Sequence, residues 1–282
     1  MNAEKMKEIK MNVSVYAVHV RQLSDWHDED AAFRHYRNMG IVAADVLESE
    51  LVDYSLEEYK SKLNRAGMDF GAFVATTDII TAEGVNLEEN LTRVKGFIDE
   101  LERLGVPKIM LAPNVRNAES PEEYYAMRER MVEGYQSMAE YARGSGVTVM
   151  IENQSVRQRA DSLIEDCKYI IDNAPDVGFV LDAGNFFCVR EDVLTAYEVF
   201  RDRIVHSHIK DWEYNEFGRI VRSYMPPLRS AVMGKGLLPL DTLITRMRDD
   251  GYSGSLLLEV NGRPFDTELL DKSAEYLLSF VR

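Results

Sequence analysis

Short apolar runs alternate with longer amphipathic segments along the whole chain. Each run is four to seven residues long and rich in Val, Ile, Leu and Met. The runs are 11–17, 41–47, 70–75, 108–112, 147–151, 178–181, 205–209 and 256–260. Continuous short runs of this kind are typical of strands buried on both faces of a parallel sheet. We therefore predict eight parallel strands.

The segments between the runs have the length and punctuation of helices. Leu91, Val94, Ile98 and Leu101 recur at helical spacing and form one apolar stripe. Other residues mark the ends of predicted helices. Ser120-Pro121 followed by Glu123 is typical of a helix N-terminus, and Gly105 and Gly146 are typical of helix C-termini. Further helices are predicted over 161–171 and 241–248.

Eight strands with intervening helices, at about 35 residues per unit, predict a (β/α)8 TIM barrel. We expect one α/β domain over residues 1–282. The alternative is a doubly wound open sheet, which normally carries a Gly-rich phosphate loop after its first strand. The first strand here is followed by His19-Val-Arg-Gln-Leu, which contains no glycine.

The connection after the seventh predicted strand is unusually long. Residues 211–236 contain aromatics, three arginines and Pro226-Pro227. Long connections in compact domains are usually functional or disordered. We interpret this one as a lid over the mouth of the barrel, with a passive or oligomer-forming insertion as the alternative.

The charge balance excludes several classes of partner. The chain has 33 Lys and Arg against 48 Asp and Glu, a formal charge of −15. An acidic surface disfavours nucleic acid and anionic membrane surfaces. Two cysteines cannot form a disulfide framework, and the first residues contain no apolar signal region, so we expect a cytoplasmic protein. No apolar stretch approaches the length of a membrane span.

Four consecutive predicted strands end in a residue that can bind a metal ion. They are Glu152, Asp182, His208 and Glu259. In a barrel, inward-facing residues at the carboxyl ends of the strands converge on the active-site mouth. Three carboxylates cannot share that small volume without a cation. Each residue alone is compatible with a salt bridge or a turn, but the set predicts one divalent ion.

The donor set of three oxygens and one nitrogen suits Mn²⁺ best, with Mg²⁺, Co²⁺ or Zn²⁺ as alternatives. Three neighbours carry further expectations. His206 faces inward one layer deeper and supports the site or the core. Lys210 faces the mouth and contacts substrate oxygens or neutralises a carboxylate, and Asp211 orients His208, holds the lid or caps a loop.

An ordered set of motifs resembles the xylose isomerase-like barrels of the sugar phosphate isomerase/epimerase superfamily. The similarity covers nearly the whole chain. The matching segments are 104–107, 142–153, 180–185, 206–211 (His-Ser-His-Ile-Lys-Asp), 234–239 and 258–259. Endonuclease IV barrels, which use several histidines for three metals, do not fit, because no histidine lies between His35 and His206.

The resemblance implies that Glu152, Asp182, His208 and Glu259 hold one metal ion. By the same resemblance, Glu152 and Glu259 are the acid–base pair that moves a proton through an enediolate. Asn185 stands where the ketose 3-epimerases carry a histidine. An asparagine can hydrogen-bond a hydroxyl but cannot carry a proton.

These observations lead us to expect an isomerase or epimerase acting on a sugar or polyol. The alternatives are a lyase (a dehydratase of a keto-cyclitol or a dehydroshikimate-like substrate) and a non-catalytic sugar-binding barrel. The candidate substrate contacts are Lys210, Asn185, Asn153, Trp212, Arg219 and His19. A homo-oligomer is a further expectation from the resemblance.

Overall fold

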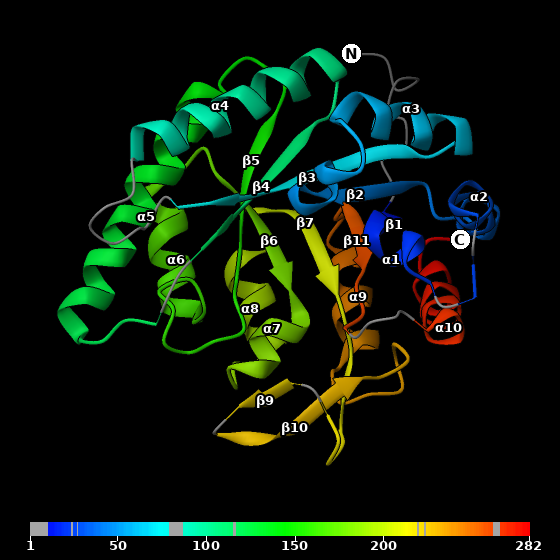
Figure 1. The fold of residues 1–282 in the computed structure, drawn as a ribbon. Helices are drawn as coiled ribbons and strands as arrows, with labels where there is room; N and C mark the ends of the chain where they lie inside the picture. The colour runs from blue at the N-terminus through cyan, green and yellow to red at the C-terminus, as the bar shows by residue number, and fades with distance from the viewer. Residues whose placement is uncertain are drawn as a thin grey trace, which may run out of the picture.

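Eight parallel strands close into a barrel that is surrounded by helices (Figure 1). The computed structural model describes residues 11–23, 25–26, 28–78, 87–114, 117–218, 220–222, 224–261 and 266–282. Around the barrel the strands follow the order β1-β11-β7-β6-β5-β4-β3-β2. The strands are β1 (Asn12–Tyr16), β2 (Ala43–Leu47), β3 (Asp69–Thr77), β4 (Lys108–Pro113), β5 (Thr148–Glu152), β6 (Gly178–Asp182), β7 (Ile204–Ile209) and β11 (Ser255–Leu258). The predicted single-domain (β/α)8 barrel is confirmed.

Helices follow the barrel strands in sequence, and the longer ones surround the barrel. They are α1 (Ala17–Arg21), α2 (Glu29–Met39), the 3₁₀ helix η2 (Glu48–Val52), α3 (Leu56–Ala66), α4 (Leu87–Leu104), α5 (Pro121–Tyr141), α6 (Ile164–Asn173), α7 (Ala183–Cys188), α8 (Val193–Phe200), α9 (Leu240–Asp249) and α10 (Thr267–Leu278). No helix in these described ranges is long and apolar enough to cross a membrane.

The helix boundaries follow from local chemistry. The hydroxyl of Ser120 accepts the amide of Glu123 and Pro121 occupies the first turn of α5, as predicted. Gly105 and Gly146, which precede β4 and β5, have φ values of +65° and +81°, a conformation that costs glycine little. On α4, Val94, Ile98 and Leu101 are fully buried, whereas Leu91 is half-buried.

The segment after β7 contains a small antiparallel sheet and is not an irregular loop. Its strands are β8 (Trp212–Tyr214), β9 (Ile220–Arg222) and β10 (Met225–Ser230), in the order β8-β10-β9. The small sheet lies on the side of the barrel to which the arrowheads of β6 and β7 point (Figure 1). Pro226 and Pro227 fall in a register shift of β10, between Met225 and Leu228, so the strand tolerates two residues that cannot donate to a ladder.

Strand register places the predicted ligands at one end of the barrel. Asp182 pairs with His208 across β6 and β7, and His208 pairs with Leu257 on β11. The amide of Glu259 donates to the carbonyl of Ile209 at 3.0 Å and continues this pairing just beyond β11. Since side chains alternate along a strand, this register turns the four candidate ligands toward the same mouth.

Candidate active site

Four side chains of the types that bind metal ions meet at the carboxyl end of the barrel. Glu152 and Asp182 are the last residues of β5 and β6, His208 is the penultimate residue of β7, and Glu259 follows β11. Each offers a ligand atom, and these four atoms all lie within 4.8 Å of one another. The structure therefore brings together the four residues that the sequence singles out.

His208 is the centre of this cluster. Its Nδ1 lies 2.5 Å from Oε1 of Glu152 and 3.5 Å from Oε2 of Glu259. The imidazole is 1% exposed, and the two carboxylates are 11% and 16% exposed at their side chains. One oxygen of each glutamate thus faces the histidine from the mouth side of the barrel.

Lys210, the first residue after β7, also contacts the cluster. Its ammonium lies 2.7 Å from Oδ2 of Asp182 and 2.5 Å from Oε1 of Glu259. The oxygen of Asn185 lies at 3.5 Å. A Cβ at Gly184 would lie only 2.1 Å from Cγ of Lys210, so the path of the lysine side chain requires glycine there.

The charged side chains of the cluster shift one another's pKa values. Burial alone would lower the pKa of His208, but the carboxylates of Glu152 and Glu259 outweigh it and raise this pKa to about 9. Burial opposes ionisation of Glu152, yet His208 and Lys210 bring its pKa down to about 2. Burial and the two glutamates raise the pKa of Asp182 well above its usual value. Three ionised carboxylates here require added positive charge.

The side chains of Asn153 and Asn185 hydrogen-bond backbone groups next to Asp182. The amide of Asn153 donates to the carbonyl of Asp182 at 3.0 Å and its oxygen accepts the amide of Asp182 at 2.8 Å. Both groups of the Asn153 side chain are therefore used by the backbone of a candidate ligand, which favours a supporting role over the predicted substrate contact. Asn185 donates to the carbonyl of Asn153 at 2.9 Å and keeps its oxygen toward Lys210.

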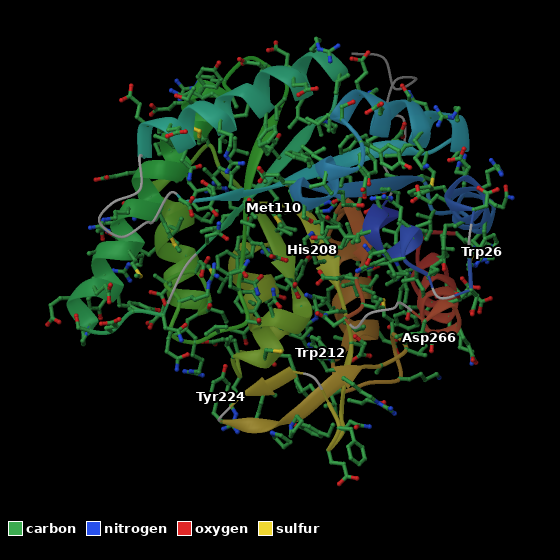
Figure 2. The ribbon with its side chains drawn as sticks, in the orientation of Figure 1. Trp26, Met110, His208, Trp212, Tyr224 and Asp266 are labelled. Atoms are coloured by element: carbon green, nitrogen blue, oxygen red, sulfur yellow. The ribbon has the colours of Figure 1, made fainter. Side chains whose placement is uncertain are left out.

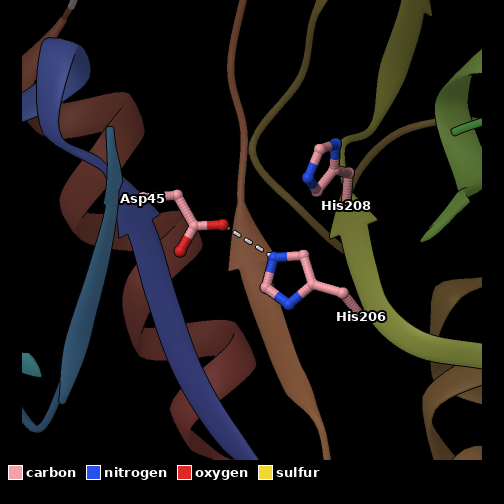
Figure 3. Close-up of side chains that lie close together, drawn as sticks. All are labelled: Asp45, His206 and His208. Atoms are coloured by element: carbon pink, nitrogen blue, oxygen red, sulfur yellow. Dashed lines mark ion pairs between the residues drawn. The ribbon is translucent and has the colours of Figure 1, made fainter. Parts of the chain in front are cut away.

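A second group of buried polar side chains lies one layer below His208 (Figure 3). Nε2 of His206 lies 2.8 Å from Oδ2 of Asp45, which belongs to β2, and both side chains are 1% exposed. Burial lowers the pKa of His206, and the ammonium of Lys108 adds to that effect. His206 occupies the deeper layer that the sequence predicts, and the rings of His206 and His208 meet edge to face at 5.4 Å.

Asp211 connects the two ends of the inserted segment that follows β7. Its carboxylate accepts the backbone amides of Trp212, Gly234, Gly236 and Leu238 at 2.9–3.1 Å. Trp212, at the base of the small sheet (Figure 2), is 2% exposed, and its indole N–H donates to the carbonyl of Gly184 at 3.1 Å. Both residues anchor the insertion to the barrel, and for Trp212 this is a different role from the substrate contact for which the sequence made it a candidate.

Of the two remaining predicted contacts, the structure describes His19 but not Arg219. His19, in α1, is buried and meets the ring of Tyr16 edge-on at 5.4 Å. Arg219 is outside the residues that the structure describes.

Two residues of the site were missed by the sequence reasoning. The hydroxyl of Tyr16 lies 3.3–3.4 Å from both ring nitrogens of His208. The side-chain amide of Gln154 donates to Oε2 of Glu152 at 2.9 Å. Strand alternation could have revealed Tyr16, because it ends β1 in the layer of His208. Gln154 lies two residues beyond Glu152 in a loop and gives no such signal.

Solved structures of low sequence identity share this fold. A xylose isomerase-like TIM barrel protein from Mycobacterium smegmatis, in complex with magnesium, aligns with a TM-score of 0.71 at 18% identity over 96% of each chain. A probable 3-DHS dehydratase involved in petrobactin synthesis in Bacillus anthracis aligns with a TM-score of 0.73 at 13% identity over 95% of this chain and 99% of the other.

Two curated relatives are similar in sequence. An inosose isomerase from Halalkalibacterium halodurans is 22% identical over 242 residues, which are 85% of this chain and 82% of the relative. An inosose dehydratase from Lacticaseibacillus casei is 23% identical over 161 residues, 53% of each protein. The sequence profile of one family matches residues 10–280, nearly the whole length. The chain belongs to the family of xylose isomerase-like TIM barrels.

Proposed function

We propose that this protein is a divalent-metal-dependent isomerase or epimerase of a sugar or cyclitol, which transfers a proton at the carbon next to a carbonyl. One observation carries the proposal: four ligand-type side chains from β5, β6, β7 and the end of β11 converge within 4.8 Å. The relatives named inosose isomerase and inosose dehydratase support a small polyol-derived ketone as substrate.

The residues fit a metal ion. Oδ2 of Asp182 is buried, and the ammonium of Lys210 lies 2.7 Å from it. Three carboxylates and one imidazole provide a hard donor set that suits Mn²⁺, our proposed ion, or Mg²⁺. The ligands would be Glu152, Asp182, His208 and Glu259. A divalent ion held there would polarise the substrate carbonyl and stabilise the negative charge of an enediolate.

One divalent ion also balances the formal charge of the barrel interior. Asp45, Glu152, Asp182 and Glu259 are acidic, and Lys108 and Lys210 are basic; Glu259 and Lys108 are half-buried, and the other four are buried. Their charges sum to zero when a single divalent ion is added and the histidines are neutral. This balance favours one ion per chain and disfavours a second ion beside Asp45 and His206.

The side chains of the site have separate roles in the proposed reaction. A glutamate carboxylate removes the carbon-bound proton, and the proton is returned to complete isomerisation. Lys210 lies where its ammonium can bind a substrate oxygen beside Asp182 and Glu259. The insertion anchored by Asp211 is proposed as a lid that excludes water and protects the enediolate.

A lyase is the second candidate. Dehydration begins with the same proton removal, but a hydroxyl on the neighbouring carbon then leaves as water. The dehydratase among the curated relatives supports this reading as directly as the isomerase supports the first.

The test begins with metal content. We expect about one divalent ion per chain after reconstitution with Mn²⁺, and weaker retention in Glu152→Ala and Glu259→Ala. Incubation with ketoses and keto-cyclitols in heavy water, followed by NMR, should show deuterium at the carbon next to the carbonyl. Loss of water separates a dehydratase from an isomerase. A folded protein that binds no Mn²⁺ or Zn²⁺ would contradict the proposal and favour a sugar-binding barrel.

A further inference from the structure

A further cavity lies at the amino ends of the barrel strands, opposite the four candidate ligands. It has a volume of about 580 Å³, within the range of small-molecule sites. Lys108 and Ile204, the first residues of β4 and β7, line it together with Tyr252 and Gly254, which precede β11. Because TIM barrels keep their active sites at the carboxyl end, the proposed reaction does not account for this amino-end cavity.

Lys108 is the cationic residue of the inner wall of the amino-end cavity. It pairs with Thr148 across β4 and β5, and Thr148 shares the inner face of β5 with Glu152. The side chain of Lys108 therefore starts inside the barrel. In the described part of the chain its ammonium forms no ion pair or hydrogen bond, and the only charge that acts on it strongly is Asp45. The carboxylate of Asp45 lies 2.8 Å from His206 instead.

The charge of Lys108 is poorly compensated. Burial lowers the pKa of Lys108, and the carboxylate of Asp45 opposes this effect only in part. The second cation that lines the cavity, Arg201, already lies 3.5 Å from Glu198 and 3.9 Å from Asp250. A half-buried ammonium without a close counterion is stabilised by a bound anion. The amino-end cavity therefore offers a place for one negative charge, at Lys108.

The rim of the amino-end cavity carries hydrogen-bond acceptors. Asp202 and Asp250 are exposed and belong to its lining. Carboxylate oxygens accept hydrogen bonds from hydroxyl groups, but they repel an anion of higher charge such as a phosphate. Ile204 and the ring of Tyr252 add apolar surface to the wall. A ligand that fits this lining has one carboxylate for Lys108 and several hydroxyls for the rim.

We propose that the amino-end cavity is a binding site for a sugar acid, a small polyhydroxylated monocarboxylate. Its carboxylate pairs with the ammonium of Lys108, its hydroxyls donate to Asp202 and Asp250, and its carbon chain lies along Tyr252. A neutral polyol would leave Lys108 without a counterion, and phosphate would place a second negative charge beside the rim. Since the site lies at the other end of the barrel from the candidate metal ligands, the inference does not rest on the proposed reaction.

Isothermal titration calorimetry of the purified protein with D-gluconate tests the site. D-Glucitol is the matched probe, because it has a CH₂OH group in place of the carboxylate. We expect saturable binding of D-gluconate at neutral pH, and binding at least about tenfold weaker for D-glucitol and for inorganic phosphate. No binding of D-gluconate, or equal affinity for D-glucitol or phosphate, would overturn the inference.

Two lysine variants locate the bound anion. Lys108→Met removes the ammonium and keeps a similar length, and it should weaken D-gluconate binding about 10–100-fold. Lys210→Met removes the other lysine inside the barrel, beside the candidate metal ligands, and should leave the affinity unchanged. Binding that persists in Lys108→Met would overturn the inference, and its loss in Lys210→Met alone would assign D-gluconate to the opposite mouth.

Reductive methylation of the wild type gives a readout that needs no variant. Formaldehyde with cyanoborohydride methylates free amines, and peptide mass spectrometry follows each lysine. Saturating D-gluconate should slow the methylation of Lys108 severalfold and leave that of Lys168, which is exposed on α6, unchanged. Equal methylation of Lys108 with and without D-gluconate would overturn the inference even if Lys108→Met failed to fold.

Discussion

The carboxylate of Asp211 is predicted to hold the inserted segment closed at its base. It accepts four backbone amides, from Trp212 at one end of the insertion and from Gly234, Gly236 and Leu238 at the other. A Cβ at Gly236 would lie 2.2 Å from the carboxylate, so the chain can approach this closely only as glycine. The substitution Asp211→Asn tests this arrangement with little change of volume.

The expected cost follows from the hydrogen bonds. The amide oxygen of asparagine can replace one carboxylate oxygen, but its NH₂ group would face two backbone donors. Two hydrogen bonds are then lost at about 1–3 kcal/mol each, or about 2–6 kcal/mol of the free energy of unfolding. Glu213→Gln is the control, since Glu213 pairs with Arg229 on the exposed face of the same insertion, and it should change stability by less than about 0.5 kcal/mol.

Urea unfolding followed by far-UV circular dichroism measures both variants. Limited proteolysis should in addition cut Asp211→Asn within residues 212–236 under conditions that leave Glu213→Gln intact. The reasoning is refuted if Asp211→Asn loses no more stability than the control, or if its insertion resists protease as well as that of the wild type.

Three other predictions concern the proposed metal site. Gly184→Ala should cost about 1–3 kcal/mol of stability in thermal unfolding and weaken Co²⁺ binding, because its methyl group overlaps Lys210; an unchanged melting temperature would contradict this. Elemental analysis of Mn²⁺-loaded protein should give one ion per chain in the wild type and in Asp45→Asn, and two ions in the wild type would contradict the charge balance of the barrel interior. Because the glutamates raise the pKa of His208 to about 9, it is protonated near neutral pH in the metal-free protein. Mn²⁺ binding should therefore release at least one proton at about pH 7, and the contribution of His208 should fall as the pH rises through 9, as measured by calorimetry in buffers of different ionisation enthalpy.

The barrel and its candidate ligands could be predicted because both follow from short periodic patterns. The side-chain period of two in a strand places Glu152, Asp182 and His208 on the inner face once the strand ends are known. The same rule places His206 one layer below His208, where the structure has it beside Asp45. Local sequence is sufficient for these positions because backbone register alone determines them.

The insertion and the supporting contacts depend on non-local structure. Pro226-Pro227 is typical of a loop, and only pairing of Leu228 with both Tyr214 and Ile220 makes the segment the middle strand of a sheet. Asn153 follows a ligand and points between strands, where it bonds the backbone of Asp182, a partner 29 residues away. No sequence pattern within either segment predicts which distant residues it contacts.

We expect the proposed reaction to depend on these non-local contacts more than on the candidate ligands. The same four ligands suit an isomerase and a dehydratase, since both chemistries begin with proton removal beside a polarised carbonyl. What separates them is whether a proton returns to carbon or a hydroxyl leaves as water, and this outcome depends on the residues around the four ligands. Gln154 reaches Glu152 only because the Arg159–Asp161 pair fastens its loop, and Lys210 reaches Glu259 only because Gly184 leaves a path. Substitutions at Gln154 and Gly184 should therefore alter the chemistry of the site while all four ligands are still in place.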